Sequence, residues 1–199
     1  MHAGRRHPTR IAFTLIETVT ALTIASVAGV TILASLATTT SNAADSLDKV
    51  VALGIAQQLL DEVSGMKYVE APGGEYDTPM GPGSPEVAAG ARRQFDDIDD
   101  YNGVSTSPPT DRWGIRLGAD DGRQGTRHVN FQVPASFFTG WKQQVDVSYV
   151  SDSNLSTVLT SGASNHRQIR VRIFLTEADG TVKTLADISR VVANVPNGG

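Results

Sequence analysis

Cysteine is missing from all 199 residues of the chain. Its absence excludes a disulfide framework, a thiolate zinc site and a cysteine nucleophile. An excess of positive charge is missing too, because 17 Lys and Arg stand against 21 Asp and Glu, a formal net charge of −4. Such a balance offers no basic surface for nucleic acid. What is present, 40% apolar and 19% charged residues, is typical of a folded protein.

Ionisable side chains are absent from one long stretch near the N-terminus. The 27 residues from Thr18 to Ala44 contain none. The first 12 residues carry three arginines and no acid, and the rest of the chain has 14 Lys and Arg against 21 Asp and Glu, net −7. About 20 helical residues cross a hydrocarbon core of roughly 30 Å. A basic head, an uncharged run and an acidic body therefore predict a membrane-inserted N-terminus with its basic end in the cytoplasm.

Two interpretations of this run remain open. In the first it is a cleaved signal peptide with Ser41-Asn42-Ala43 as the cleavage site, and the mature protein is a secreted or periplasmic binding module. In the second the apolar helix is kept and the chain is cut before it. Glu17 favours the second, because an ordinary signal peptide has no use for an acid there. A carboxylate near the bilayer centre costs about 2.5–3.5 kcal/mol, so it calls for a partner.

The residues around Glu17 resemble a known processing signal. After the basic leader and before the apolar run the chain reads Phe13-Thr14-Leu15-Ile16-Glu17, which is similar to the cleavage and methylation motif of type IV prepilins and type II secretion pseudopilins. The resemblance implies cleavage by a prepilin peptidase between Ala12 and Phe13, followed by N-methylation of Phe13. It also implies that Glu17 pairs with the N-terminal amine of a neighbouring subunit during assembly. The family usually has Gly where this chain has Ala12, and because Ala is the nearest substitute in size, cleavage is expected to be retained.

The same resemblance implies a structural subunit and not an enzyme. The expected role is that of a minor pilin or minor pseudopilin in a type IV pilus or a type II secretion pseudopilus. The implied partners are other pilin subunits, the prepilin peptidase and N-methyltransferase, an assembly platform in the inner membrane, and the lipid bilayer. The leader would lie in the cytoplasm and the body on the periplasmic side, until assembly places the subunit in a filament. No GxSxG elbow or HExxH pattern occurs in the sequence, and no cofactor is expected.

Helical spacing of apolar residues continues beyond the uncharged run. Apolar residues recur every four positions at Leu47, Val51, Ile55, Leu59 and Val63. We therefore expect one helix from about Phe13 to about Tyr68, although Ser41 or Asn42 is also a suitable N-cap for a second helix. The expected organisation is a leader at 1–12, a transmembrane and assembly helix at 13–38, its amphipathic continuation at 39–68, and a loop-rich body at 69–199.

The body is expected to join irregular loops to an antiparallel sheet. Residues 70–126 are rich in Gly, Pro and Asp and predict a long connection, with a short helix or strand near 87–95. Residues 177–180 predict a hairpin turn. Alternation of apolar and polar residues predicts strands at 128–133, 141–149, 169–175, 181–185 and 191–195. A sheet with one apolar face covering the long helix gives a pilin-like α+β fold.

One acidic cluster in the body is a candidate cation site. Its side chains offer the hard oxygen ligands that Ca²⁺ prefers, and the residues are Asp96, Asp97, Asp99, Asp100 and Asn102. Some pseudopilins bind calcium through a loop of the body. The spacing does not match an EF-hand loop, and we favour the interpretation of a solvated acidic turn. His128 and His166 lack the spacing of metal ligands.

Overall fold

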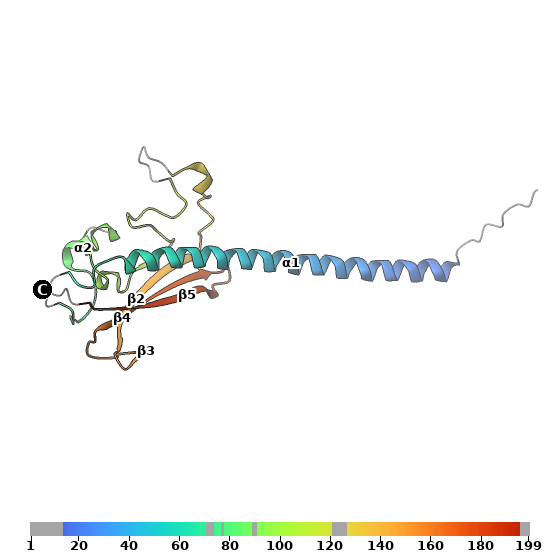
Figure 1. Ribbon diagram of the computed structural model, residues 1–199. Helices are drawn as coiled ribbons and strands as arrows, with labels where there is room; N and C mark the ends of the chain where they lie inside the picture. The colour runs from blue at the N-terminus through green and yellow to red at the C-terminus, as the bar shows by residue number, and fades with distance from the viewer. Residues whose placement is uncertain (1–13, 71–73, 77, 89–90, 121–126, 196–199) are drawn as a thin grey trace, which may run out of the picture. The chain divides into compact units, whose positions relative to one another are not determined.

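The computed structural model describes residues 14–70, 74–76, 78–88, 91–120 and 127–195. The chain divides into two compact units, residues 1–47 and residues 48–199, which are described separately (Figure 1). One long helix, α1 (Leu15–Ser64), begins in the first unit and ends in the second. The expected helix is confirmed, with an end four residues earlier than predicted, and the alternative of a second helix starting at Ser41 or Asn42 is wrong.

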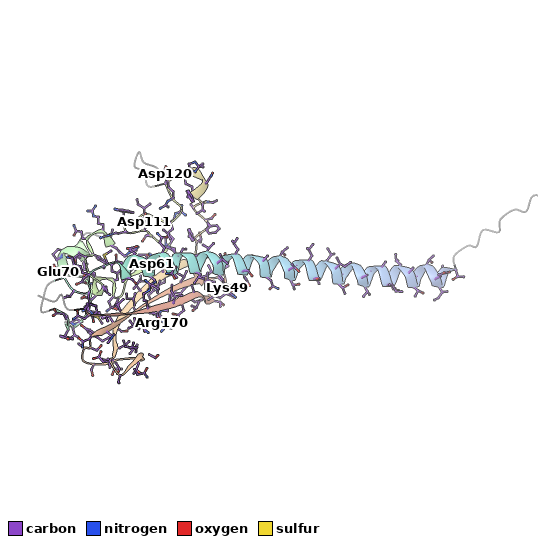
Figure 2. The ribbon with its side chains drawn as sticks, in the orientation of Figure 1. Lys49, Asp61, Glu70, Asp111, Asp120 and Arg170 are labelled. Carbon is purple, nitrogen blue, oxygen red and sulfur yellow. The ribbon has the colours of Figure 1, made fainter. Side chains whose placement is uncertain are left out.

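In the first unit, α1 is long and apolar enough to cross a membrane. Its side chains from Leu15 to Ala44 are all exposed (Figure 2). Hydroxyl groups are frequent in this segment, and they bond to the helix itself. Each of eight donates to a backbone carbonyl three or four residues earlier: Thr18, Thr20, Thr23, Ser26, Thr31, Thr38, Thr39 and Thr40. This local bonding lets a threonine-rich run remain helical without leaving its hydroxyl groups unpaired.

In the second unit, the last turns of α1 lie on one face of a sheet. Apolar residues at helical spacing place one stripe against the strands, and its buried members are Ala52, Ile55, Ala56, Leu59, Leu60 and Val63. Facing them are strand residues that are almost fully buried, among them Val145, Ile169, Val171 and Ile173. The core of the body is therefore a helix-on-sheet layer.

The sheet is antiparallel throughout and has the order β1-β2-β4-β5. Its strands are β1 (Ser105–Thr106), β2 (Trp141–Ser151), β4 (His166–Thr176) and β5 (Val182–Ala193), and β3 (Asn154–Val158) pairs with the end of β2. The predictions of strands at 141–149 and 169–175 are confirmed. So is the hairpin turn, in which the N–H of Glu177 donates to the carbonyl of Thr181 and Gly180 has φ +86°.

Two predictions of strands need correction. The segments 181–185 and 191–195 belong to a single strand, β5, whose register shifts opposite Ile173 and Phe174. The strand predicted at 128–133 is wrong, because residues Val129–Phe131 form the 3-10 helix η3. There the ring of His128 accepts the N–H of Asn130, and the carbonyl of His128 accepts the N–H of Phe131. These local bonds use backbone N–H and carbonyl groups that a strand would need for pairing with a neighbouring strand.

The connection between helix and sheet contains little regular structure, as expected. It holds α2 (Ser84–Ala88) and the 3-10 helices η1 (Arg92–Gln94) and η2 (Asp99–Tyr101), so the prediction of a short element near 87–95 is confirmed. Arginine side chains fix the loops by donating to backbone carbonyls: Arg112 to Phe95 at 3.1 Å, Arg116 to Ala135 at 3.3 Å and Arg127 to Ala119 at 2.9 Å.

Candidate functional site

Glu17, the predicted assembly residue, lies in the first turn of α1. The hydroxyl of Thr14 accepts the N–H of Glu17 at 3.4 Å, and the carbonyl of Thr14 accepts the N–H of Thr18 at 3.1 Å. Thr14 is therefore the N-cap of the helix. An acid three residues after the cap suits the positive end of the helix dipole. From Ile11 to Ala44 no other side chain is ionisable.

The other residues of the motif have simpler positions. Leu15 and Ile16 are 84% and 73% exposed, so none of the described residues of the first unit covers them. Ala12 and Phe13, where cleavage and methylation are predicted, lie outside the described residues. The capping role of Thr14 escaped the sequence reasoning, although a threonine three residues before a glutamate is a known signal for a helix start.

The acidic cluster of the body brings together only part of the predicted set. One carboxylate oxygen from each of Glu86, Asp96 and Asp100 lies within 4.8 Å of the others. Glu86 comes from α2 and was not predicted. Three close carboxylates are the kind of group that can hold a hard cation. Beside them is a hollow of about 370 Å³ that Glu70 and Asp97 also line.

The remaining predicted ligands are occupied by contacts within the fold. Asp97 Oδ1 accepts the backbone N–H groups of Asp99 and Asp100 at 3.0 and 3.3 Å. Asp99 pairs with Arg167 at 3.0 Å. The side chain of Asn102 donates to the carbonyl of Met80 and accepts the N–H of Val147. These three side chains therefore order the loop, and two of them, Asp97 and Asp99, also line the hollow beside Glu86 and Asp100.

Burial changes the ionisation of two acids in this cluster. Asp97 and Asp100 are each 5% exposed, so the interpretation of a solvated acidic turn is wrong for both. Burial, together with the neighbouring carboxyl of Asp99, raises the pKa of Asp97 to about 7. Burial raises the pKa of Asp100 to about 6, although two backbone N–H groups oppose the shift.

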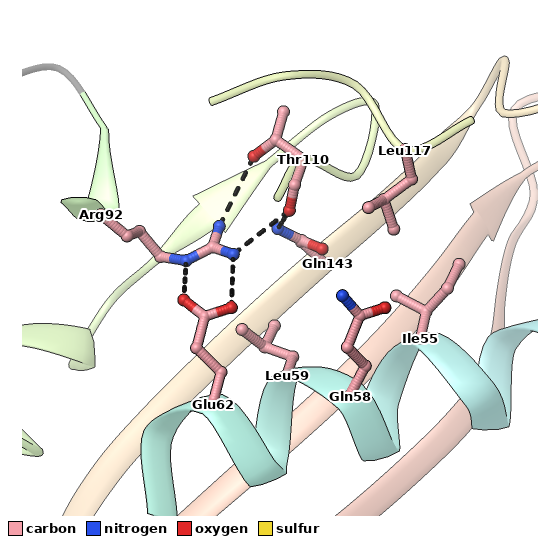
Figure 3. Close-up of a pocket in the computed structure, with 8 residues that line it drawn as sticks. All are labelled: Ile55, Gln58, Leu59, Glu62, Arg92, Thr110, Leu117 and Gln143. Carbon is pink, nitrogen blue, oxygen red and sulfur yellow. Dashed lines mark hydrogen bonds and ion pairs between the residues drawn. The ribbon is translucent and has the colours of Figure 1, made fainter. Parts of the chain in front are cut away.

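A second polar group ties α1 to the loops (Figure 3). Arg92 binds Glu62 through two hydrogen bonds of 3.1 and 3.2 Å, and the hydroxyl of Tyr101 donates to Glu62 at 2.9 Å. Arg92 and Gln143 both donate to the carbonyl of Thr110. The cavity between them, about 10 Å³, has room for about one water molecule. All these groups are satisfied by one another, so the arrangement is suited to holding elements together.

Arg167 also connects separate elements of the body. Its side chain is fully buried in β4, pairs with Asp99 and lies over the ring of Tyr68 at 4.4 Å. It also donates to the backbone carbonyls of Tyr68 and Glu75. This arginine thus connects the segment after α1 to η2 and the sheet. An arginine within an alternating strand carries no sequence signal that would have identified it.

Comparison with known proteins adds no relative. A scan of protein-family models, a search of curated proteins and a search of solved structures each gave no match.

Proposed function

We propose that the chain is a structural subunit of a filament, a minor pilin of a type IV pilus or a minor pseudopilin of a type II secretion system. One observation carries the proposal: Glu17 is the single ionisable residue in the first turn of a long apolar helix, within the motif Phe13 to Glu17. The α+β body, with the end of α1 on an antiparallel sheet, is compatible with the pilin-like fold expected from the resemblance.

The position of the helix start supports this function. The predicted cut before Phe13 would leave Thr14 in place, so the capping bond to Glu17 would survive removal of the leader. The first turn of α1 therefore needs no residue of the leader. The new amine of Phe13 and the carboxylate of Glu17 on a neighbouring subunit would then remove each other's desolvation cost in the bilayer. Such a pair fixes the position of one helix along another.

The proposed course of assembly follows from these contacts. The chain is inserted in the inner membrane with its leader in the cytoplasm and its body on the periplasmic side. The prepilin peptidase and N-methyltransferase trims it and methylates Phe13. An assembly platform then adds the subunit to a filament of pilins or pseudopilins through α1.

A secreted binding module released near Ala43 is the alternative. It is favoured by one observation: every buried apolar residue among those described lies at or after Ala52, so such a cut would leave the core of the body complete. Mass spectrometry of the mature N-terminus separates the two functions. The filament subunit begins at a methylated Phe13, and the secreted module begins near Ala44.

The role of Glu17 is tested by substitution in the native host. We expect Glu17→Ala to insert in the membrane, to be processed and to fold, but to be absent from sheared filaments. Asp45→Asn removes an exposed acid farther along the same helix and is the matched control, expected to assemble normally. Normal assembly of Glu17→Ala would rule out the proposed pairing.

A further inference from the structure

The hairpin of β2 and β3 projects an uncharged segment into solvent. From Ser153 to Asn165 the chain has no charged residue, and all five residues of β3 are exposed. Only two pairs set the register of β3 against β2, Val150 with Val158 and Ser151 with Asn154, and the register shifts between them. Just after β3, the N–H of Leu159 also donates to the carbonyl of Tyr149 at 2.8 Å. Figure 1 shows β3 at the border of the sheet region, away from α2.

Within this hairpin the chain reads Asn154-Leu155-Ser156, the acceptor pattern for N-linked saccharides. Of the seven asparagines in the sequence, only Asn154 has a serine or threonine two residues later. Side chains two residues apart on a strand point to the same side, so the amide of Asn154 and the hydroxyl of Ser156 face the same way. A transferase that reads both groups can therefore reach them together.

The local hydrogen bonding leaves the reacting nitrogen accessible. Asn154 Oδ1 accepts the N–H of Ser156 at 3.1 Å. Among the described residues, none accepts a hydrogen bond from Asn154 Nδ2. Asp152, in the turn between β2 and β3, is held in place because it pairs with the ring of His166 at 2.7 Å and accepts the N–H of Asn165. The acceptor is thus exposed and lies two residues after Asp152, in a hairpin whose turn is anchored to β4.

We propose that Asn154 is a site of N-linked glycosylation, with a lipid-linked saccharyl phosphate as the donor. The proposal rests on the proposed function, which places the body outside the cytoplasm, where such donors are used. The bond that forms joins Asn154 Nδ2 to the anomeric carbon of the saccharide. The bond that breaks joins this carbon to the phosphate oxygen, the lipid phosphate leaves with the electron pair, and the proton of Nδ2 passes to a base of the transferase. No group is oxidised or reduced.

A saccharide at this position also has a local physical effect. Leu155 and Val158 are 43% and 46% exposed on the same short strand. Val158 lies on the same side of the strand as Asn154, so a hydrophilic group attached to Asn154 would shield Val158 from neighbouring molecules. The modification would therefore reduce apolar contacts between this hairpin and neighbouring subunits on a filament surface.

The native protein provides the first test. The full chain, purified in detergent from its own host, is digested and sequenced by electron-transfer mass spectrometry. We expect a saccharide mass on Asn154, which disappears in Ser156→Ala and remains in Ser156→Thr. Asn130 is exposed but is followed two residues later by Gln132, so it should carry no saccharide. An unmodified Asn154 in a chain whose body is accessible to protease from the periplasmic side overturns the proposal.

A second arm keeps this result distinct from failure of the proposed function. If protease protection shows the body in the cytoplasm, the proposed function fails, and the acceptor is tested by incubating the folded chain with an oligosaccharyltransferase and a lipid-linked oligosaccharide. Transfer to Asn154, abolished by Ser156→Ala, supports the site. No transfer under conditions in which a control acceptor peptide is modified overturns it.

Discussion

Gly54 is a residue whose replacement should stabilise the protein. It lies exposed in the middle of α1, and a Cβ added there would meet no atom within 4 Å. Because alanine restricts the unfolded chain more than glycine does, Gly54→Ala should raise the free energy of unfolding by about 1 kcal/mol. Thermal and urea denaturation of the detergent-solubilised chain would measure this. A decrease would mean that α1 does not remain helical at this point.

Asp97 should make the stability of the body depend on pH. Burial raises its pKa from 3.8 to about 7, so the folded chain holds a proton that the unfolded chain releases above about pH 4. The free energy of unfolding therefore falls as the pH rises from about 4 to 7. Asp97→Asn keeps the oxygen that accepts two backbone N–H groups and cannot ionise. It should stabilise the body by on the order of 1–3 kcal/mol at pH 8.

The measurement is urea denaturation at several pH values between 5 and 8. The curve of Asp97→Asn should be flatter than that of the unchanged chain. Asp100, whose pKa is raised to about 6, leaves a smaller dependence in the variant. Equal slopes in the two proteins would show that Asp97 is ionised in the fold.

At the scale of elements, two neighbouring acids of α1 should differ sharply in importance. Glu62 and its partner Arg92 have side chains 16% and 6% exposed, whereas Asp61 and Arg190 are 57% and 42% exposed. Removing one partner of a buried pair leaves an unpaired charge and costs about 3–5 kcal/mol. Glu62→Gln should therefore lower the free energy of unfolding by several kcal/mol, whereas Asp61→Asn should change it little because solvent screens the exposed pair. Equal changes in the free energy of unfolding for the two variants would contradict the role of the Glu62–Arg92 pair in holding α1 to the loops.

Sequence reasoning succeeded where a pattern is local. The alternation in β2 and β4 and the spacing of apolar residues in α1 each depend on neighbours in the chain. It failed for β5, where a register shift interrupts the alternation and splits one strand into two apparent ones. It also missed the meeting of Glu86 with Asp96, because the approach of α2 to η2 depends on loops without periodicity.

For the whole molecule, the two units should be separable. None of the residues 14–47, the part of the first unit that the structure describes, is buried, so removing them takes no buried apolar side chain from the body. A chain of residues 48–199 should remain soluble and should unfold cooperatively, with a free energy within about 0.5 kcal/mol of that of the full chain. Near-ultraviolet circular dichroism during heating would test this. A fragment without a cooperative transition would show that the body depends on the first unit.

The hydroxyl groups of α1 that bond to their own helix affect how well the first unit is accommodated in the hydrocarbon core of a bilayer. Eight serine and threonine side chains from Thr18 to Thr40 already donate to carbonyls of their own helix. A lipid tail beside these side chains would therefore contact hydroxyl groups that already donate a hydrogen bond. The carboxylate of Glu17 is different, because hydrogen bonds within its own helix would not remove its negative charge. In hydrocarbon, this one charged group would favour association of the helix with a neighbour that supplies a positive charge.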